Sequence, residues 1–414
     1  MKNRKVTRRE VLKHAATLGI AAAVPFSLTL AGCRSGRGFG GDAWRDLAAP
    51  APEGSLCPRV SNMPNGTVIL SWLEPKEGGT AAFRSSIWRG QNWSPSAIIA
   101  EGRHFSRDRA SAPGVVALSS HNLIAYWSQK PVEKQSSNEI ELFMAVSTDS
   151  GGHWTLPVLV NRSTAQPGED NGYSSAAALD EKQAQLIWLD GRNWEKEKRV
   201  ALMARAVRVD GTMGESRLLD GDTCTCCSTS LVQTKTGLLA AYRGHTPENI
   251  RDIALVRLAS GAWSQPRIVH PDHWHIEACP VNGPHLDADG QRAALVWFSA
   301  ANEQPAVKLA FSSDGGGEFS APVRIDTGRT IGRGQVTLLA DGSVVVLWLE
   351  NESGVAKLLA RRVYPDGTAE GVLEVARSTN ISYPHTARTT TGIVVTWAEA
   401  TPGSRVHVGV LKTT

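Results

Sequence analysis

Val344-Val345-Val346-Leu347-Trp348 is one of seven apolar runs, rich in β-branched residues, that end in an aromatic residue and recur along the chain. The seven aromatic residues that mark the repeat are Trp72, Trp127, Trp188, Tyr242, Trp297, Trp348 and Trp397. Successive aromatics are separated by 55, 61, 54, 55, 51 and 49 residues, which is the size of a four-stranded propeller blade. Continuous apolar runs are typical of strands buried on both faces. The repeat predicts an all-β fold, a β-propeller of seven four-stranded blades, with six blades as the alternative.

Two turns share a pattern that belongs to one kind of propeller. Ser147-Thr148-Asp149-Ser150-Gly151-Gly152-His153-Trp154 fits the Asp-box pattern S-x-D-x-G-x-x-W, and Ser312-Ser313-Asp314-Gly315-Gly316-Gly317-Glu318-Phe319 fits it with Phe in place of Trp. With these turns the repeat resembles the sialidase superfamily of Asp-box propellers. The resemblance implies structural hairpins in which the Asp binds turn backbone, and it says little about activity.

The last repeat is short, because only one further strand, residues 405–412, follows Trp397. The segment Asp42-Ala43-Trp44-Arg45-Asp46-Leu47 resembles the start of the outer strand at Asn92-Trp93-Ser94-Pro95. We therefore expect strands from both termini to close the last blade.

The N-terminal sequence is typical of an export signal, and we do not expect it to be part of the fold. Thr7-Arg8-Arg9-Glu10-Val11-Leu12-Lys13 resembles a twin-arginine signal, and Leu30-Ala31-Gly32-Cys33 resembles a lipobox. The apolar run between them, residues 15–30, is shorter than the roughly 20 residues that span a bilayer. We expect residues 1–32 to be the signal, 33–41 a lipidated flexible tether with Cys33 as the lipidation site, and 42–414 a single propeller domain.

The net charge and the expected lipid anchor indicate which class of partner is disfavoured and which cellular location is favoured. Residues 1–32 hold six Lys or Arg and one Glu, so the 44 basic and 40 acidic residues of the chain become 38 and 39 without them. This balance argues against a nucleic-acid partner, which calls for a basic patch. A lipid at Cys33 predicts membrane attachment facing the periplasm of the cell envelope. Arg34 is not the aspartate that retains lipoproteins in the inner membrane, which favours the outer membrane.

The arginine motif that sialidases carry on the first inner strand is incomplete here. The matching segment is Leu56-Cys57-Pro58-Arg59, with leucine where the first arginine of the expected triad belongs. The remaining catalytic candidates are Arg59, Arg243, Arg388 and Tyr383, with Arg109 and Arg333 as further arginines near blade starts. The sequence leans against an enzyme. If the chain is one, the resemblance implies an exo-α-sialidase type of glycoside hydrolase.

Cysteines in three repeats are predicted to meet at one mouth of the channel. Asp222-Thr223-Cys224-Thr225-Cys226-Cys227 holds three of them, and Cys57 and Cys279 occur in other repeats. Cys57 and Cys227 each lie fifteen residues before the aromatic of their repeat, and all inner strands of a propeller run in the same direction.

Two interpretations of this cluster stay open. Disulfides are permitted outside the cytoplasm, and a bridge from Cys224 or Cys226 to Cys279 crosses neighbouring blades easily. Five cysteines remain besides Cys33, so at least one is unpaired. Alternatively, clustered thiolates select a soft metal, copper first and zinc second, with no other cofactor expected. The ligand candidates are Cys224, Cys226, Cys227, Cys279 and His275, with His273 and His385 near the same mouth.

The sequence therefore predicts a cell-envelope propeller lipoprotein that binds a small ligand, metal or glycan at the channel mouth, with copper on the cysteine cluster favoured. In an extended strand, Cys224 and Cys226 would point the same way and Cys227 the opposite way. The alternatives are a sialidase or related glycoside hydrolase, and a scaffold that binds protein or glycan.

Overall fold

The computed structural model describes residues 39–40, 42–130, 139–161, 171–400 and 403–413. The predicted signal, the lipidation site Cys33 and most of the tether lie outside the described residues. No helix within the described ranges is both long and apolar enough to cross a membrane. Arg34–Thr414 form one compact unit.

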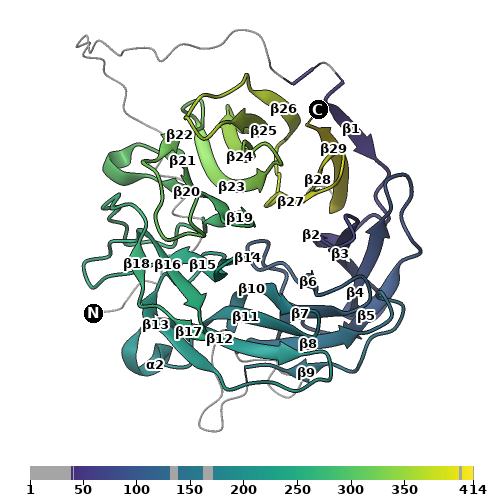
Figure 1. The fold of residues 1–414 in the computed structure, drawn as a ribbon. Coiled ribbons are helices and arrows are strands. Elements are labelled where there is room, and N and C mark those ends of the chain that lie inside the picture. Colours follow the sequence, from purple (N-terminus) through teal and green to yellow (C-terminus); the bar gives the residue numbers. More distant parts are fainter. Residues whose placement is uncertain (1–38, 41, 131–138, 162–170, 401–402, 414) are drawn as a thin grey trace, which may run out of the picture. The chain divides into compact units, whose positions relative to one another are not determined.

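The unit is an all-β propeller of seven antiparallel sheets (Figure 1). The first four blades, from inner to outer strand, are β2 Leu56–Asn62, β3 Val68–Pro75, β4 Ala81–Trp88, β5 Ala97–Gly102; β6 Gly114–Ala117, β7 Leu123–Gln129, β8 Glu141–Ser147, β9 Val158–Leu159; β10 Asn171–Asp180, β11 Gln183–Asp190, β12 Val200–Arg208, β13 Arg217–Thr223; and β14 Ser230–Thr234, β15 Gly237–Arg243, β16 Ile253–Ala259, β17 Ala262–Trp263 with β18 Arg267–Ile268.

The other three blades follow the same order. They are β19 His285–Asp289, β20 Arg292–Ser299, β21 Ala306–Ser312, β22 Val323–Arg324; β23 Thr330–Leu338, β24 Val344–Glu352, β25 Val355–Val363, β26 Leu373–Ser378; and β27 His385–Arg388, β28 Gly392–Glu399, β29 Arg405–Lys412, β1 Trp44–Leu47. Short helical turns occur at Glu77–Gly79, Trp194–Glu197 (α2) and Ala301–Glu303. The prediction of seven blades is confirmed, and six blades are excluded.

Both termini close the ring, as predicted. Strand β1 pairs with β29, with Trp44 opposite Leu411. The Trp44 ring lies 5.9 Å from that of Trp397, and it covers Gly409, where a Cβ atom would clash with it. Because β1 is the outer strand of a sheet whose other three strands come from the C-terminal end, one blade ties the two ends of the propeller together.

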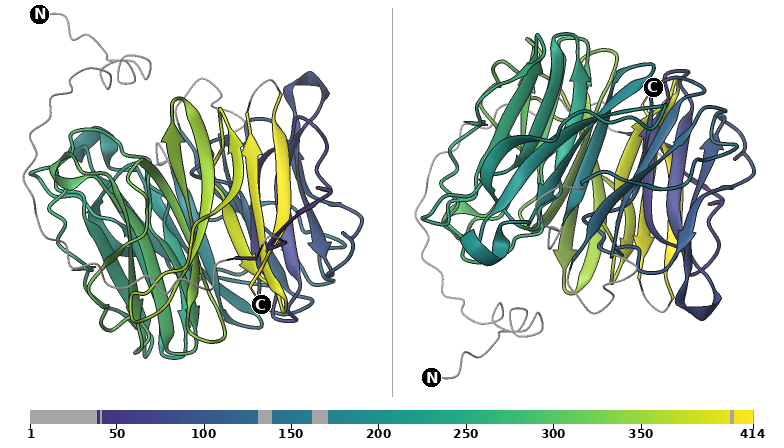
Figure 2. Two further views of the ribbon diagram at one scale, coloured as in Figure 1. Left: turned by 90° about the horizontal axis from the view of Figure 1, so that it is seen from above. Right: turned by 90° about the horizontal axis from the view of Figure 1, so that it is seen from below.

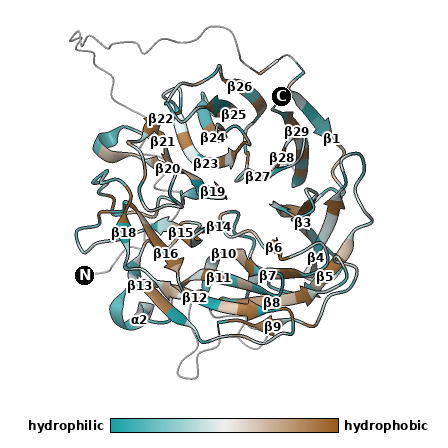
Figure 3. Cartoon of the chain, in the orientation of Figure 1, coloured by the Kyte–Doolittle hydropathy of each residue, from teal (hydrophilic) through white to brown (hydrophobic). Residues whose placement is uncertain are grey.

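The repeated aromatics form the centre of each blade. Trp72, Trp127, Trp188, Trp297 and Trp348 are among the largest fully buried side chains, and Tyr242 and Trp397 are also buried. All seven lie on the second strand, and Figure 3 shows hydrophobic stretches along the strands of the blades. In the side views of Figure 2 the blades stand side by side, so each apolar strand is covered by its own sheet and by the next blade.

The Asp-box turns have the expected internal bonds. Asp149 accepts hydrogen bonds from the Ser147 hydroxyl at 2.8 Å and from the His153 backbone N–H at 2.9 Å. Asp314 accepts the same pair of bonds from Ser312 and Glu318, at 2.8 and 3.1 Å. Each box connects the third and fourth strands of its blade, so these residues stabilise hairpins and lie away from the channel.

Candidate functional site

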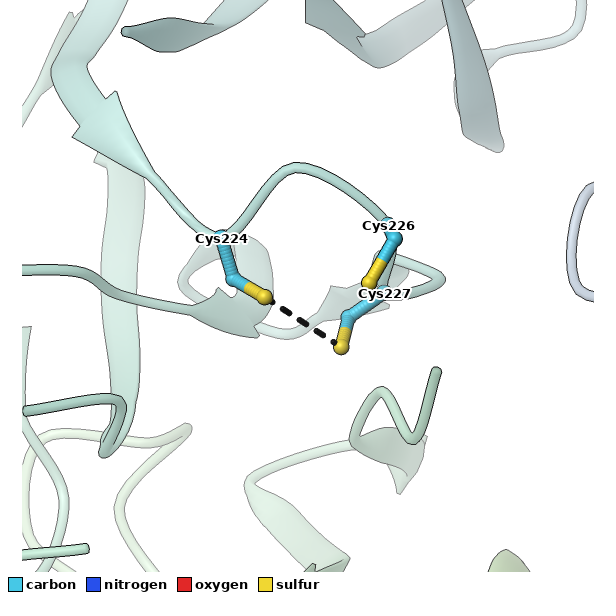
Figure 4. A group of neighbouring side chains, drawn as sticks. All are labelled: Cys224, Cys226 and Cys227. Atoms are coloured by element: carbon cyan, nitrogen blue, oxygen red, sulfur yellow. Dashed lines mark hydrogen bonds between the residues drawn. The ribbon is translucent and has the colours of Figure 1, made fainter. Parts of the chain in front are cut away.

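Three of the cysteines lie in the connection between the third and fourth blades. Strand β13 ends at Thr223 and β14 begins at Ser230, and the residues between them form a turn rather than an extended strand. The turn brings the Sγ atoms of Cys224 and Cys227 to 3.6 Å of one another, as Figure 4 shows. The expectation that Cys224 and Cys226 would point the same way and Cys227 the other way is therefore wrong, because it assumed an extended backbone.

A disulfide joins Cys226 to Cys279, with the two Cα atoms 6.1 Å apart. It connects the turn before the fourth blade to the segment before the fifth, which is one of the bridges that the sequence allowed. Three free thiols remain among the described residues, namely Cys57, Cys224 and Cys227, and all three are buried. The Sγ atoms of Cys224, Cys226 and Cys227 all lie within 4.8 Å of one another.

The Cys224 sulfur lies in a positive environment that favours its thiolate. A hydrogen bond from Cys227 is the main cause that lowers the pKa of Cys224, and the nearby Arg243 and Arg251 add to it, giving a pKa of about 5. Nη1 of Arg251 donates to Cys224 Sγ at 3.2 Å. Burial, followed by the bond to Cys224, raises the pKa of Cys227. These opposite shifts favour the thiolate of Cys224 over that of Cys227.

Cys57 is separate from this cluster, although the repeat alignment placed it beside Cys227. It packs into the apolar cluster that contains Phe105 and Trp127, and burial raises its pKa to about 12. His275 is exposed, and its backbone forms a bridge with Ile250. The group of candidate metal ligands found among the described residues contains no histidine.

Arg243 lies beneath the cysteine turn and is fully buried. Its guanidinium makes four hydrogen bonds to backbone carbonyls, two of them to Asn282 and one each to Arg251 and Phe298. It also lies over the Trp274 ring, at 4.8 Å from the ring centre. With its donors occupied by carbonyls, Arg243 fixes the base of the site and offers little to a substrate.

The other catalytic candidates line a central cavity of about 390 Å³. Arg59, Arg388, Tyr383 and Arg109 all contribute to its wall. Nη1 of Arg388 donates to the Leu338 carbonyl at 2.8 Å, and the Tyr383 hydroxyl donates to the carbonyl of Val281. Burial is the main cause of a raised pKa at Tyr383.

Two of the residues that line the cavity, Tyr383 and Arg109, lie near Arg333. Arg333 lies over the Tyr383 ring at 4.8 Å from its centre. Burial, followed by the charge of Arg333, lowers the pKa of Arg109, so these two cations lie near one another. Nη1 of Arg109 donates to Asn380 Oδ1 at 2.9 Å.

Solved structures of other proteins have a similar fold. A polysaccharide lyase of the PL25 ulvan lyase family, bound to -[GlcA(1-4)Rha3S]-, matches with a TM-score of 0.58 and 13% identity over 89% of this chain and 96% of that chain. The chain shares its fold with an ulvan lyase.

Two sialidases also match, with lower TM-scores. The NanB sialidase of Streptococcus pneumoniae gives 0.44 at 10% identity, over 99% of this chain and 73% of that chain. The Trypanosoma rangeli sialidase gives 0.43 at 10% identity, over 87% and 54%. No protein-family model matches the chain, and no curated protein matches its sequence. The neighbours include enzymes that act on glycans, and at these identities the likeness concerns the fold alone.

Sequence reasoning missed Arg251, which reaches Cys224 from a strand connection 27 residues further along the chain. No local sequence pattern predicts such a contact. The pairing of Cys224 with Cys227 does have a signal, because residues three apart come together when the backbone turns.

Proposed function

We propose that this chain is a cell-envelope lipoprotein that binds a soft metal ion, copper(I) in the first place, through Cys224 and Cys227. The observation that carries the proposal is the pair of buried free thiols 3.6 Å apart. Thiolates are the ligands that copper(I) and zinc prefer in proteins. The disulfide takes Cys226 and Cys279 out of the ligand set and holds the turn in place.

The spacing of the two sulfurs suits a shared ion. Sulfur ligands about 2.3 Å from a tetrahedral zinc ion are about 3.8 Å from one another. The observed 3.6 Å between Cys224 and Cys227 is close to this value, so both thiolates reach one tetrahedral ion with little movement of the turn, whereas a copper(I) ion held by these two sulfurs alone requires them to move apart until they lie on opposite sides of it.

The charge of the surroundings favours copper(I) over zinc. Two thiolates and one copper(I) ion carry a net charge of minus one, whereas two thiolates and Zn²⁺ are neutral. Arg251 donates to Cys224, and both Arg243 and Arg251 act electrostatically on its sulfur. The positive charges of two guanidinium groups compensate the negative charge of a buried copper(I) complex. A neutral zinc complex does not require such compensation.

The proposed location agrees with the state of the cysteines. Structural disulfides persist in oxidising compartments such as the periplasm and are rare in the cytosol. The bond between Cys226 and Cys279 supports a place in the envelope, in keeping with the export signal and lipobox expected at residues 1–33.

Metal content tests this proposal. The mature protein, purified without oxygen, is loaded with copper(I) from a chelator that competes for it, and bound copper is measured by mass spectrometry. We expect one copper per chain, lost in Cys224→Ser and Cys227→Ser and kept in Cys57→Ser. The last variant is a matched control because Cys57 is also a buried free thiol. Equal copper in all four proteins would refute the assignment of the site.

A second candidate function is a glycan-active enzyme, favoured by Tyr383 and Arg109, which line the cavity, and by the nearby Arg333. Guanidinium groups suit the carboxylate of an acidic sugar. The test is release of sialic acid from a fluorogenic sialoside and of unsaturated products from a uronate-containing polysaccharide. Turnover that Tyr383→Phe abolishes would support this candidate, and absence of turnover on both substrates would remove it.

A further inference from the structure

Each inner strand places one residue at the same register position in the channel. In every blade this residue is paired with the one directly before the buried aromatic of the second strand. The seven residues are Arg59, Gly114, Ser175, Ser230, His285, Gln335 and His385. We call this set the polar layer. All of its members except Gly114 line the central cavity.

Gly114 leaves room for its neighbours in the layer. A Cβ atom at Gly114 would lie 2.6 Å from the ring and hydroxyl of Tyr126 and 3.2 Å from Cδ of Arg59. The guanidinium of Arg59 lies over the Tyr126 ring, 5.6 Å from its centre. The missing side chain therefore lets Arg59 lie against Tyr126 inside the channel.

Arg59 lacks a counter-charge. It makes one hydrogen bond, from Nη1 to the carbonyl of Ala112 at 3.4 Å, and no carboxylate pairs with it in the described part of the chain. Asp287 also lines the channel, but its oxygens accept backbone N–H groups of Leu338 at 2.7 Å and Ala288 at 2.9 Å, and Arg388 is the cation beside it. Arg59 is half-buried in the wall of the cavity, so the guanidinium N–H groups that have no acceptor are available to bind an anion there.

Two further donors of the layer lack acceptors. Burial and the charge of Arg59 lower the pKa of His285 to about 3, so the ring is neutral. Its Nδ1 accepts the backbone N–H of Val336 at 3.2 Å, which places the proton on Nε2. Ser230 Oγ accepts the Leu286 N–H at 2.9 Å, so its hydroxyl proton is free to donate. Neither proton has a protein acceptor among the described residues.

His385 belongs to the same group. Its Nε2 atom is buried and has no hydrogen-bond partner within the described residues. Burial, Arg59 and His285 lower its pKa, so this ring is neutral as well. The blades that carry Arg59, His285 and His385 thus direct a cation and two neutral rings with unused nitrogens at one space.

We propose that the polar layer binds one small oxyanion inside the channel, held by Arg59, His285 and Ser230. Oxyanions are acceptors only, and hydrogen bonds to charged donors are the stronger kind. The ligand class is a carboxylate, sulfate or phosphate group, either free or carried by a sugar. The proposal goes beyond metal binding and needs no cysteine, so either proposal can fail without the other.

Calorimetry at constant ionic strength in chloride buffer tests the site with inorganic sulfate, inorganic phosphate and glucuronate as probes. We expect one anion per chain, bound at least tenfold more weakly by Arg59→Gln and unchanged by Arg89→Gln. The second variant removes the same charge from an exposed turn. Binding of an inorganic probe supports a free anion, and binding of glucuronate alone supports an acidic sugar.

A second variant covers the case in which Arg59→Gln does not fold. His385→Glu places a carboxylate in the layer beside Arg59, so it is expected to abolish anion binding and raise the melting temperature. His385→Gln, which adds no charge, is its matched control and should still bind. Failure of all three probes to bind the wild-type protein, or equal binding by Arg59→Gln, would overturn the proposal.

Discussion

The Sγ atoms of Cys224 and Cys227 lie 3.6 Å apart as free thiols in one turn, while Cys226 between them is bonded to Cys279. One short segment thus supplies a structural sulfur and two sulfurs available for chemistry. The disulfide ties the turn to the next blade connection, and it therefore limits the movement of the free pair.

The disulfide should contribute to stability in its own right. It joins residues 53 apart in the sequence, and removal of a disulfide typically costs about 2–4 kcal/mol. Cys226→Ser and Cys279→Ser should each lower the free energy of unfolding in urea by this amount. The double variant should cost no more than either single one, whereas additive losses would show that the two sulfurs act separately.

The charge of the free pair predicts a pH dependence. The pKa of Cys224 is lowered to about 5, so its thiolate is present above that pH and lost as the pH falls through it. Ultraviolet absorbance of the thiolate should therefore persist from pH 8 to pH 6 and decline near pH 5. Arg251→Gln should shift the decline to higher pH. Cys57, with a pKa of about 12, adds no signal in this range. A midpoint near that of a free thiol would contradict the electrostatic account.

Closure of the ring depends on Gly409. A methyl group at this position would occupy the space of the Trp44 ring. Gly409→Ala should therefore detach β1 and cost about 1–3 kcal/mol, the usual range for overpacking. Gly371→Ala is the matched control, because a Cβ atom there meets nothing within 4 Å. Equal stability of the two variants in urea would show that Trp44 does not secure the last blade.

Lipidation of Cys33 has a direct test in the cell. Protein with Cys33 intact should fractionate with membranes, since acyl chains provide the attachment. Cys33→Ala should appear in the soluble periplasmic fraction. Detection of both proteins in the same fraction would argue against the lipid anchor.

The fold was predictable because every blade buries the same strand. Each aromatic from Trp72 to Trp397 lies between its own sheet and a neighbouring blade, so the requirement recurs at one spacing along the chain. The closing strand could be recognised for the same reason, since its Trp44 occupies the position of an outer-strand residue. The additional strand β18 of the fourth blade has no repeated pattern and could not be foreseen.

The site was predictable in part. The repeat alignment predicted that the five cysteines lie at one place. The structure brings together four of them, and Cys57 lies apart in an apolar cluster. Side-chain directions depended on the backbone after Thr223, where the chain turns, and no residue type there forces a strand. The role of Arg251 could not be predicted, because the fold brings it to Cys224 from a distant part of the sequence.

The central claim is that Cys224 and Cys227 hold one copper(I) ion, and X-ray absorption at the copper edge of the loaded mature protein tests it most directly. The account predicts copper(I) bound by two sulfur ligands in the wild type and in Cys57→Ser, and loss of this signal in Cys224→Ser. A copper shell of nitrogen or oxygen ligands only, or the same sulfur shell in Cys224→Ser, would contradict it.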